Sequence, residues 1–490
     1  MDNIKSAIER QNYMEAFELL KEYVSLHPIF TDTIAILEAS IYMGLDDFQA
    51  AFPCIQEGLR YNPANHELYF MLGMVYEAFT KYHKAYLCYE NALFYCKDNA
   101  DDYSAIEEHL KSFIDQTGTT VPKVSIIILN FNQLNHTLNC ITTIRKLCPS
   151  SAYEIICVDN GSLESPEEWL KAQPDIKYQI NHKNLGFAGG CNVGIRLAEP
   201  DNDIFLLNND TLLTENALFW LRMGLYEKEE IGASGAVSNC ASNRQAVTEN
   251  FQSLSECMDY GFTHNIPMDQ PLSYRVTLIG FAMLIKRTAL NKAGLFDERF
   301  YPGNFEDNDY CTRLILNDYK LVVCKNSFIY HFGSAGFSTL EEHSPTENYK
   351  STLETNRNHY IEKWHISPQD SFLWHAELID LMDLNDKTKA INCLDIGCAC
   401  GATLLEIQNR YPNAEIYGIE SDPCYADFAS HIATIAQGNI ETMDFPFDVL
   451  FDYIFLEDIP ERLTNPEQLL AKLRPHLSKQ GIIITRHANT

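Results

Sequence analysis

The middle of the chain alternates short apolar runs with helix-like segments, and this alternation limits the fold more than any other feature. Val124–Leu129 and Glu154–Val158 are runs of strand length, and Ile176–Ile180 and Ile204–Leu207 follow them. Apolar runs of about four to eight residues, separated by helices, are typical of buried strands joined by helical crossovers. The sequence therefore predicts an α/β domain with a doubly wound sheet that binds ligands at the carboxyl ends of its strands.

Polar and glycine residues follow each of these runs. The first run ends in Asn130-Phe131-Asn132, the second in Asp159-Asn160-Gly161-Ser162, and the fourth in Asn208-Asn209-Asp210, while the glycine-rich segment Asn184–Asn192 follows the third. Asn and Asp are ordinary turn formers, so folding alone explains any one of these tips. Four polar tips that meet at one edge of a sheet instead predict a ligand-binding crevice.

Residues 1–115 carry an internal repeat. Ala16, Ala51 and Ala85 lie 35 and 34 residues apart, and a large residue follows each of them four positions later. Small residues at this period let the two helices of a hairpin approach, and stacked hairpins bury the remaining apolar faces. The pattern resembles tetratricopeptide repeats; the alternative is a helical bundle without a repeat. We expect an all-helical platform for a protein partner or for self-association.

The chain of 490 residues is strongly acidic. It has 37 Lys and Arg against 67 Asp and Glu, a formal net charge of −30. Such a chain is a poor nucleic-acid binder, because phosphate neutralisation needs clustered cations. No apolar run approaches the ~18 residues of a membrane span, and the first residues lack the pattern of a secretion signal. Fifteen scattered cysteines without a CxxC pair indicate reduced thiols, so we expect a cytoplasmic location, either free or peripheral to the inner membrane face.

A second βαβ pattern begins near residue 390. Ile391–Ile396, Glu415–Ile419, Tyr453–Leu456 and Gly481–Thr485 predict its strands, and a polar stretch over 366–389 predicts a linker helix before them. The first of these strands leads into a turn with the sequence DIGCACG, which contains glycines that let the backbone approach a ligand. The sequence therefore predicts a second, smaller α/β domain.

The ordered series IIILNFN, VDNGS, NLGFAGGCNVG, LLNND and FEDNDYCTRL resembles the inverting nucleotide-sugar glycosyltransferases of family 2. The resemblance covers roughly residues 122–365 and implies the Rossmann-like fold called GT-A. It implies that Asp159 binds the nucleobase and that the glycine segment offers backbone amides to the nucleotide. The residues implied for nucleotide-sugar binding are Asn130, Asn132, Asp159, Asn160, Asn184, Gly186, Phe187, Ala188, Gly190, Asn192, Asn208 and Asn209.

The same resemblance implies a metal and a base. Asp210 stands in the place of the family's Asp-x-Asp motif, so with His331 it would hold a Mn²⁺ or Mg²⁺ on the diphosphate. Family position makes Asp307 the base that takes the proton of the acceptor hydroxyl, with Glu306 beside it. Two adjacent carboxylates repel, which raises the pKa of one of them. The structural alternatives are a turn at Asp210 and a helix start at Asp307.

The turn after Ile391–Ile396 resembles the first motif of class I S-adenosylmethionine methyltransferases. Ala399 replaces a motif glycine, and the sequence ends at Thr490 just after a fifth strand, so we expect a partial domain that is either truncated or vestigial. The resemblance implies S-adenosylmethionine as its cofactor, with an acidic residue on the ribose hydroxyls. The residues implied for this cofactor are Asp395, Gly397, Gly401 and Glu420.

Together these features predict a multidomain chain. Helical repeats occupy 1–115, a family-2 glycosyltransferase domain 122–365, a linker helix 366–389 and a methyltransferase-like domain 390–490. The expected activity is the inverting transfer of a hexosyl or rhamnosyl unit from a UDP- or dTDP-sugar to a hydroxyl of a surface glycan or a polypeptide. Two alternatives stay open: a bifunctional glycosyl- and methyltransferase, and a scaffold that binds nucleotide sugar without turnover and acts through its repeats.

Overall fold

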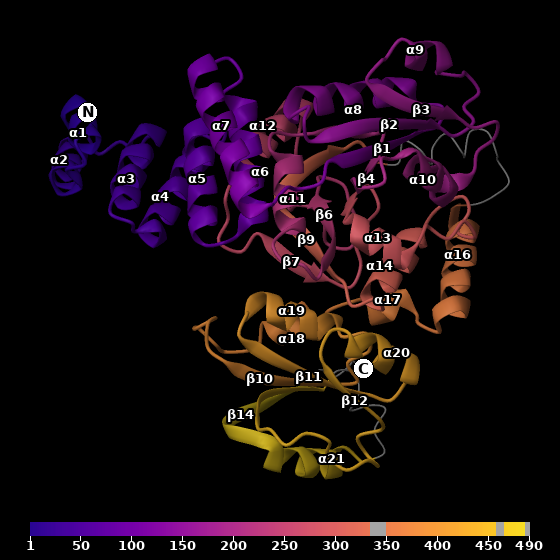
Figure 1. Ribbon diagram of the computed structural model, residues 1–490. Helices are drawn as coiled ribbons and strands as arrows, with labels where there is room; N and C mark the ends of the chain where they lie inside the picture. The colour runs from indigo at the N-terminus through magenta and orange to yellow at the C-terminus, as the bar shows by residue number, and fades with distance from the viewer. Residues whose placement is uncertain (334–348, 457–464, 486–490) are drawn as a thin grey trace.

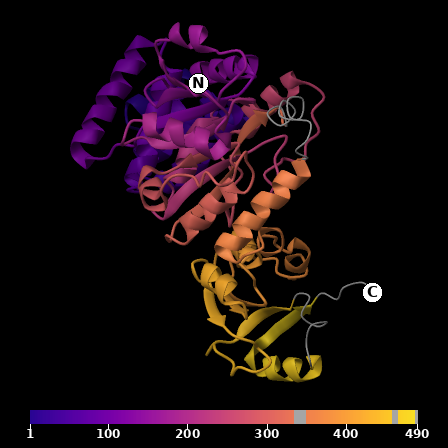
Figure 2. The same cartoon turned by 90° about the vertical axis from the view of Figure 1, so that its right-hand side faces the viewer.

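The computed structural model describes residues 1–333, 349–456 and 465–485, and it has three parts in chain order (Figure 1). An all-helical segment comes first, a nine-stranded mixed sheet with its helices second, and a five-stranded sheet last. This order confirms the predicted fold class of a helical repeat, a GT-A-like α/β domain and a small methyltransferase-like α/β domain. In both views the last part lies below the other two (Figure 2).

The amino-terminal helices pair as three successive hairpins, α1 with α2, α3 with α4 and α5 with α6. The second helices begin at Tyr13, Phe48 and Tyr82, which are 35 and 34 residues apart, as the repeat predicts. The three repeated alanines, at positions 16, 51 and 85, are fully buried between helices. The helices are α1 Asp2–Glu9, α2 Tyr13–Leu26, α3 Asp32–Gly44, α4 Phe48–Tyr61, α5 His66–Ala78, α6 Tyr82–Tyr95 and α7 Ala100–Thr117.

The sheet of the middle part has the strand order β3-β2-β1-β4-β8-β6-β9-β5, and β7 pairs with β9. The four strands predicted from the first apolar runs, β1 to β4, form a parallel half. Strand β8 is antiparallel to both of its neighbours, so the sheet is mixed; the sequence predicted its parallel strands but not this antiparallel one. The strands are β1 Val124–Asn130, β2 Tyr153–Asp159, β3 Ile176–Ile180, β4 Asp203–Asn208, β5 Thr211–Leu213, β6 Ile231–Val237, β7 Leu272–Arg275, β8 Ala282–Ile285 and β9 Lys320–His331.

Two hydrophobic cores lie on the two faces of this sheet. Helices α8 and α11 pack on one face, and α10, α13 and α14 on the other. Alternate residues of β1 divide between the two cores, since successive side chains of a strand point to opposite faces. The helices are α8 Leu134–Leu147, α9 Glu167–Lys171, α10 Gly186–Leu197, α11 Ala217–Leu225, α12 Leu254–His264, α13 Arg287–Ala293, α14 Glu306–Ile315 and α16 Tyr349–Trp364.

Helix α11 joins the repeats to the middle part. Phe219, Trp220 and Met223 lie in the same hydrophobic cluster as the repeat helices. Beside them Arg222, only 3% exposed, forms an ion pair with the buried Glu90 of α6. A buried pair with one partner removed leaves an uncompensated charge, so these two residues hold the repeats in one register on the middle part.

The last part is a parallel sheet of order β12-β11-β10-β13-β14. In place of the one linker helix predicted over 366–389 there are two helices of four residues, α17 Pro368–Ser371 and α18 Ala376–Ile379. The remaining elements are β10 Ile391–Ile396, α19 Ala402–Arg410, β11 Ala414–Glu420, α20 Pro423–Ser430, β12 Thr434–Gln437, β13 Phe451–Leu456, α21 Pro466–Leu473, the short 3₁₀ helix η1 Arg474–His476 and β14 Leu477–Thr485. Among the helices of the described ranges, none combines the length and apolar character needed to cross a bilayer.

Candidate active site

The tips of β1, β2 and β4 are joined by buried hydrogen bonds. Asp159, fully buried at the end of β2, accepts from Asn130 Nδ2 at 2.7 Å and from Ser162 Oγ at 2.5 Å. Thr137 Oγ1 donates to Asn130 Oδ1 and accepts from Asn209 Nδ2, at 2.8 and 3.2 Å. The network fixes three strand tips at one edge of the sheet. The contact between Asp159 and a nucleobase stays a prediction, because these hydrogen bonds of its carboxylate are to groups of the protein.

Asn132 and Asn160 tie the loops of this edge together. Asn132, with φ +57, receives a hydrogen bond at its Oδ1 from the Leu163 amide at 2.8 Å. Asn160 Nδ2 donates to Asn184 Oδ1 at 2.9 Å and to the Gly186 carbonyl at 3.0 Å. The side-chain amides of Asn132 and Asn160 fix the loops after β1, β2 and β3 relative to one another. These hydrogen bonds are made to other groups of the protein.

Gly161 is the point of closest contact between the loops after β2 and β3. Its φ is +81, and a Cβ on it would lie 2.5 Å from the carbonyl carbon of Lys183. Only glycine fits here, because the backbone conformation and the lack of space both exclude a side chain. This glycine is therefore required by the shape of the edge.

Helix α10 begins at Gly186, whose φ is +74, and its first turn faces the acidic segment further along the chain. The Phe187 amide donates to the Pro302 carbonyl at 2.8 Å. The ring of Phe187 lies 3.5 Å from where a Cβ on Gly280 would be, and the next residue, Ala188, is buried. This helix start thus links the glycine segment to the loop before α14.

Two other residues predicted to bind the nucleotide sugar have clear packing roles. A Cβ on Gly190 would lie 2.3 Å from Leu129 Cδ1, so glycine lets α10 approach β1. Asn192 is 1% exposed; its Nδ2 donates to the Phe296 carbonyl and to Glu298 Oε1, both at 2.9 Å, and its Oδ1 accepts from the Phe296 amide. Both amide hydrogens of Asn192 are used inside the protein. Direct contact with a nucleotide sugar stays a prediction for these two residues.

Asp210 and His331 face each other where β5 and β9 pair. His331 Nε2 lies 3.2 Å from Asp210 Oδ1, and both side chains are largely buried. The register explains the contact: Thr211, which follows Asp210, pairs with His331 across the two strands. The preceding Asn208 is fixed by its own amide, which donates to the Phe281 carbonyl at 2.8 Å. The structure therefore brings together the two residues predicted to hold a metal.

The ring of His331 has a defined orientation. Nδ1 lies 2.8 Å from the Cys240 carbonyl, and because a carbonyl only accepts, Nδ1 carries a proton and donates it. The ring stacks on Phe281 with centroids 5.2 Å apart. Burial lowers the pKa of His331, but the hydrogen bond and charge of Asp210 outweigh it and the net shift is upward. In the neutral ring the lone pair is on Nε2, on the side of Asp210, which is the form that binds metals.

Asp210 and His331 form a small donor set. In the described ranges there is no group of three or more His, Cys, Asp and Glu that could hold a metal by itself. One carboxylate and one imidazole do suit a manganese-like ion, and a nucleotide diphosphate brings oxygen ligands of its own. The residues present therefore fit a Mn²⁺ or Mg²⁺ that binds together with a nucleotide.

Asp307 is the second residue of α14, which follows an unusual stretch of backbone. Asn304 and Phe305 have φ of +75 and +69, a conformation that is costly for both and that persists where the surroundings hold it. Asp307 Oδ2 accepts from the Gly280 amide at 3.2 Å, and Oδ1 from the amide of the following residue at 2.8 Å. Burial raises the pKa of Asp307 above its ordinary value, although these hydrogen bonds oppose the shift.

Glu306 lies next to this carboxylate and is 6% exposed. Within the described part of the chain its Oε2 has no hydrogen-bond partner. Burial, and then the charge of Asp307, raise the pKa of Glu306 well above its ordinary value. Two backbone amides stabilise the charge of Asp307, whereas Glu306 Oε2 has no partner in the described ranges. We therefore expect the pair to hold one proton, on Glu306, and one charge, on Asp307.

Gly280 and Phe281 connect the acidic pair to the metal pair. The Gly280 amide binds Asp307, and the ring of the next residue, Phe281, stacks on His331. Consecutive Cα atoms are about 3.8 Å apart, so Asp307 and His331 lie on two sides of one dipeptide. Sequence reasoning missed this dipeptide's role, and also two buried supports: Thr137 on α8, and Asn356 on α16, which donates to the Gly303 carbonyl at 2.8 Å. A buried polar residue inside an ordinary helix leaves no local pattern to find.

The glycine turn of the last part is closed by one of its own predicted ligands. Gly397 and Gly401 have φ of +79 and +78, and Ala399, in place of a motif glycine, has φ +46. Glu420 Oε2 accepts from the Ala399 amide at 2.9 Å, and Asp395 at the end of β10 is 5% exposed. The carboxylate implied for the ribose of a cofactor thus supports the turn in this structure.

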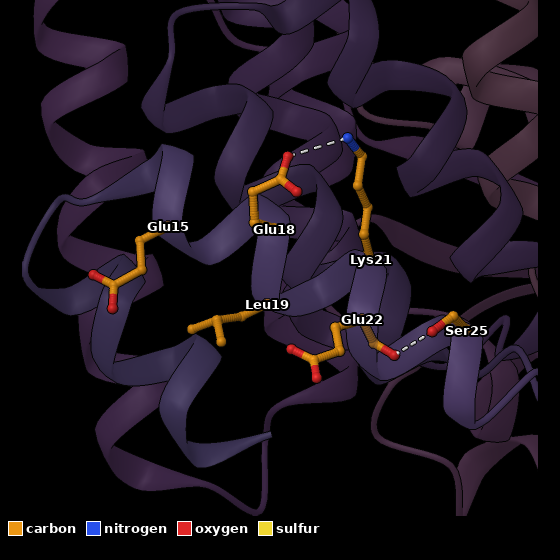
Figure 3. A pocket seen from close by; sticks show the side chains of 6 residues that line it. All are labelled: Glu15, Glu18, Leu19, Lys21, Glu22 and Ser25. Carbon is orange, nitrogen blue, oxygen red and sulfur yellow. Dashed lines mark hydrogen bonds and ion pairs between the residues drawn. The ribbon is translucent and has the colours of Figure 1, made fainter.

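A separate surface pocket of about 490 Å³ lies on the first hairpin (Figure 3). Residues of α2 line it, and Lys21 Nζ lies 3.3 Å from Glu18 Oε1 across its wall. None of the predicted site residues contributes to it. Its lining is Glu15, Glu18, Leu19, Lys21, Glu22 and Ser25.

Two family matches agree with the sequence interpretation. Residues 125–299 match the family Glycosyl transferase family 2, and residues 387–490 match a family described as Methyltransferase domain. No curated protein sequence matches the chain. The middle of the chain therefore carries a family-2 glycosyltransferase domain and its last part a methyltransferase domain, which confirms both predicted resemblances.

Several solved structures are similar in part. GalNAc-T7 with UDP, GalNAc and Mn²⁺ is 13% identical with a TM-score of 0.40, over 54% of this chain and 53% of that one. S. aureus TarS 1–349 is 14% identical with a TM-score of 0.33, over 51% and 74%. The plantazolicin methyltransferase BpumL in complex with SAH is 27% identical with a TM-score of 0.21, over 22% and 44%. The chain thus spans about half the length of GalNAc-T7.

Proposed function

We propose that this chain, with its family-2 glycosyltransferase domain, transfers a sugar from a nucleotide-diphosphate donor to an acceptor hydroxyl with inversion at the anomeric carbon. The donor class we favour is a UDP- or dTDP-hexose or -rhamnose, and the acceptor a surface glycan or a polypeptide. The observation that carries the proposal is the position of the dipeptide Gly280-Phe281. Its Gly280 amide binds Asp307, a carboxyl with a raised pKa, and its Phe281 ring stacks on His331, which faces Asp210. A base and a charge-neutralising pair at one sheet edge are the two groups that this reaction needs.

Asp307 acts as the base. The acceptor oxygen bonds to the anomeric carbon from the side opposite the diphosphate, its proton passes to an Asp307 oxygen, and the bond to the diphosphate oxygen breaks with its electron pair. Each carboxylate oxygen of Asp307 accepts one backbone hydrogen bond and keeps a lone pair for this proton. Its raised pKa makes it a better proton acceptor than an ordinary aspartate, and Glu306, which holds its own proton, adds no second charge.

Asp210 and His331 would hold a Mn²⁺ or Mg²⁺ on the diphosphate. When bound, the ion supplies positive charge to the departing phosphate oxygens. The chain's own contribution is to aim the two ligands: the Cys240 carbonyl fixes which nitrogen of His331 is protonated, and Phe281 fixes the plane of the ring. The loops after β1, β2 and β3 close the nucleotide side of this edge.

The decisive experiment compares the wild type with Asp307→Asn in a panel of UDP- and dTDP-sugars with Mn²⁺. We expect transfer and donor hydrolysis to fall by about 10²–10⁴-fold, the usual contribution of a positioned base. Calorimetry should show unchanged UDP affinity, because the amide keeps the shape of the site. Asp175→Asn, which alters an exposed carboxylate paired with Arg145, is the matched control. Wild-type turnover in Asp307→Asn would overturn the assignment of the base. UDP binding by the wild type without transfer or hydrolysis of any donor in the panel would instead favour the non-catalytic scaffold.

The methyltransferase domain favours a second activity in the same chain. Its five parallel strands, with a glycine turn after β10 and Glu420 at the end of β11, make a nucleoside site for S-adenosylmethionine the natural candidate. Asp395, Gly397, Gly401 and Glu420 would line it. Thermal shift with S-adenosylmethionine tests this: stabilisation of the wild type that is lost in Asp395→Ala supports binding. No stabilisation at millimolar ligand removes the bifunctional alternative.

A further inference from the structure

One loop, residues 238–247, closes on itself between β6 and the rest of the middle part. The Ser238 amide donates to the Gln245 carbonyl at 2.9 Å, and the Val247 amide donates to the Ser238 carbonyl at 2.8 Å. These two hydrogen bonds join the two ends of the loop directly. We refer to it as the 238–247 loop.

The first residues of the 238–247 loop grip the backbone and ring of His331. Asn239 Oδ1 accepts from the His331 amide at 2.8 Å, and Asn239 Nδ2 donates to the His331 carbonyl at 3.0 Å. The carbonyl of the next residue, Cys240, accepts a hydrogen bond from Nδ1 of the ring. Two consecutive residues thus hold every polar group of His331 except Nε2, which is the atom that faces Asp210.

The last part of the loop holds Ile279, the residue before the dipeptide that binds Asp307. Gln245 is fully buried; its Nε2 donates to the Ala236 carbonyl at 2.8 Å and its Oε1 accepts from the Ile279 amide at 2.9 Å. The amide next along, of Gly280, is the one that donates to Asp307. The same loop therefore sets the position of the base and of the metal-facing histidine.

The tip of the loop leaves the site and meets the junction with the last part of the chain. The guanidinium carbon of Arg244 lies 4.3 Å from the ring centroid of Trp374. Trp374, between α17 and α18, is 7% exposed and also carries Arg275 at 4.4 Å. Arg275 forms an ion pair with Glu406 of α19 at 3.2 Å. In Figure 1, α19 lies below β7, and the two are in contact.

The backbone at the tip is under strain. Asn243 and Arg244 both have φ of +53, a region that side chains rarely adopt. Asn243 Nδ2 is held by the Thr277 carbonyl at 2.8 Å, while Arg244 has its contact with Trp374. Strained backbone of this kind relaxes when its anchors are removed, so the tip depends on Trp374 to keep its shape.

We propose that the 238–247 loop is the positioning element of the transfer site and that the junction with the methyltransferase domain sets its geometry through the Arg244–Trp374 contact. The inference rests on the proposed function for its effect on turnover. Its physical content is independent of it, because the loop's contacts exist whether or not sugar is transferred. The helix α19 that pairs with Arg275 begins directly after the glycine turn, so a ligand at that turn has a contiguous route to Asp307.

The test uses the full chain and variants of the exposed Arg244 and the half-buried Asn239. Arg244→Ala removes an exposed side chain and should preserve the fold. We expect kcat to fall about two- to fivefold with an unchanged donor KM, the size of one exposed cation–π contact. Asn239→Ala removes two hydrogen bonds to His331, so we expect kcat to fall by about tenfold. The factor by which Mn²⁺ strengthens UDP binding should also fall by about tenfold. Arg145→Ala, an exposed arginine of the same domain, is the control.

Hydrogen exchange gives the readout that does not need activity. The His331 and Ile279 amides donate to loop side chains, so peptides covering 278–281 and 329–332 should exchange faster in Arg244→Ala and Trp374→Ala than in Arg145→Ala. Trp374→Phe, which keeps an aromatic face for Arg244, should restore slow exchange.

The outcomes separate the two proposals. If Arg244→Ala changes neither the hydrogen exchange of these peptides nor kcat, the role of the junction is refuted. If the wild type turns over slowly while these peptides exchange faster in Arg244→Ala, the result counts against the proposed function alone. Wild-type metal-dependent UDP binding in Asn239→Ala would refute the positioning of His331. If Trp374→Ala does not fold, Arg244→Ala still decides the question.

Discussion

Glu306→Gln should make the protein more stable by an amount that grows with pH. Glu306 is 6% exposed, lacks a partner for Oε2 in the described ranges, and has a pKa raised well above its ordinary value of 4.5 by burial and by Asp307. Between pH 4.5 and the folded pKa, the folded state binds this proton and the unfolded chain does not. Stability of the wild type therefore falls as pH rises through that window.

The magnitude follows from one proton. When the folded state binds one proton more than the unfolded state, the free energy of unfolding changes by about 1.4 kcal/mol per pH unit. Glutamine has the same shape and no proton to lose, so this slope is absent in the variant. The difference between Glu306→Gln and wild type should rise by about 1.4 kcal/mol for each pH unit above the ordinary glutamate pKa and level off at the folded pKa. Asp307 contributes little to the difference, because its neighbour is neutral in both proteins below that plateau.

Urea unfolding at half-unit pH steps, from just above pH 4.5 upward, measures the difference directly. Glu164→Gln changes an exposed glutamate of the loop after β2 and should give a line without slope. A difference for Glu306→Gln that is constant with pH would refute the account, since it would mean that Glu306 ionises in the folded state as it does in the unfolded chain. Glu306 would then not be protonated beside an ionised Asp307 in the folded protein.

Three further substitutions test how the edge of the sheet is built. Gly161→Ala should destabilise by about 2–4 kcal/mol in urea unfolding, because a Cβ there meets the Lys183 backbone at 2.5 Å and φ is +81. Asn192→Ala should cost about 1–3 kcal/mol by leaving the Phe296 amide and carbonyl without partners, while calorimetry shows UDP affinity within twofold of wild type. Ala399→Gly should raise the melting temperature, with a gain of about 0.5–1 kcal/mol, by relieving the φ of +46.

Local pattern was enough to place the parallel half of the large sheet. The predicted runs at β1 and β3 agree with the observed strands to within one residue. β1 is buried on both faces and has a nearly continuous apolar run, whereas β3 alternates apolar and polar residues, as a strand with one exposed face does. The antiparallel β8 was not predicted, since direction depends on the partner and leaves no mark on four apolar residues. The linker helix failed for a related reason: polar residues over 366–389 fit a helix, but the packing of Trp374 and Ile379 needs a bent chain with two short turns.

The sequence likewise predicted some features of the candidate site and not others. The resemblance to family-2 glycosyltransferases was enough to pair Asp210 with His331, and the structure brings the two side chains together where β5 and β9 pair. The resemblance could not separate a ligand contact from a packing contact. Gly190 and Asn192 lie in the glycine-rich segment, and the structure gives each a packing role: Gly190 lets α10 approach β1, and Asn192 holds Phe296. Their contact with a nucleotide sugar stays a prediction. The packing roles depend on residues far away in the sequence, which no local window contains.

The packing of the three parts bears on what the smallest active unit is. The middle part shares one hydrophobic cluster with the repeats, through α11, and another with the last part, through Phe372, Trp374 and Phe428. Removing either neighbour would expose apolar surface and leave a buried charge, Arg222 or Arg275, without its partner. The 238–247 loop adds a direct reason, since one of its anchors lies outside the matched glycosyltransferase segment. The proposed transfer site therefore extends beyond the matched segment, because Asp307, His331 and Trp374 all lie outside residues 125–299.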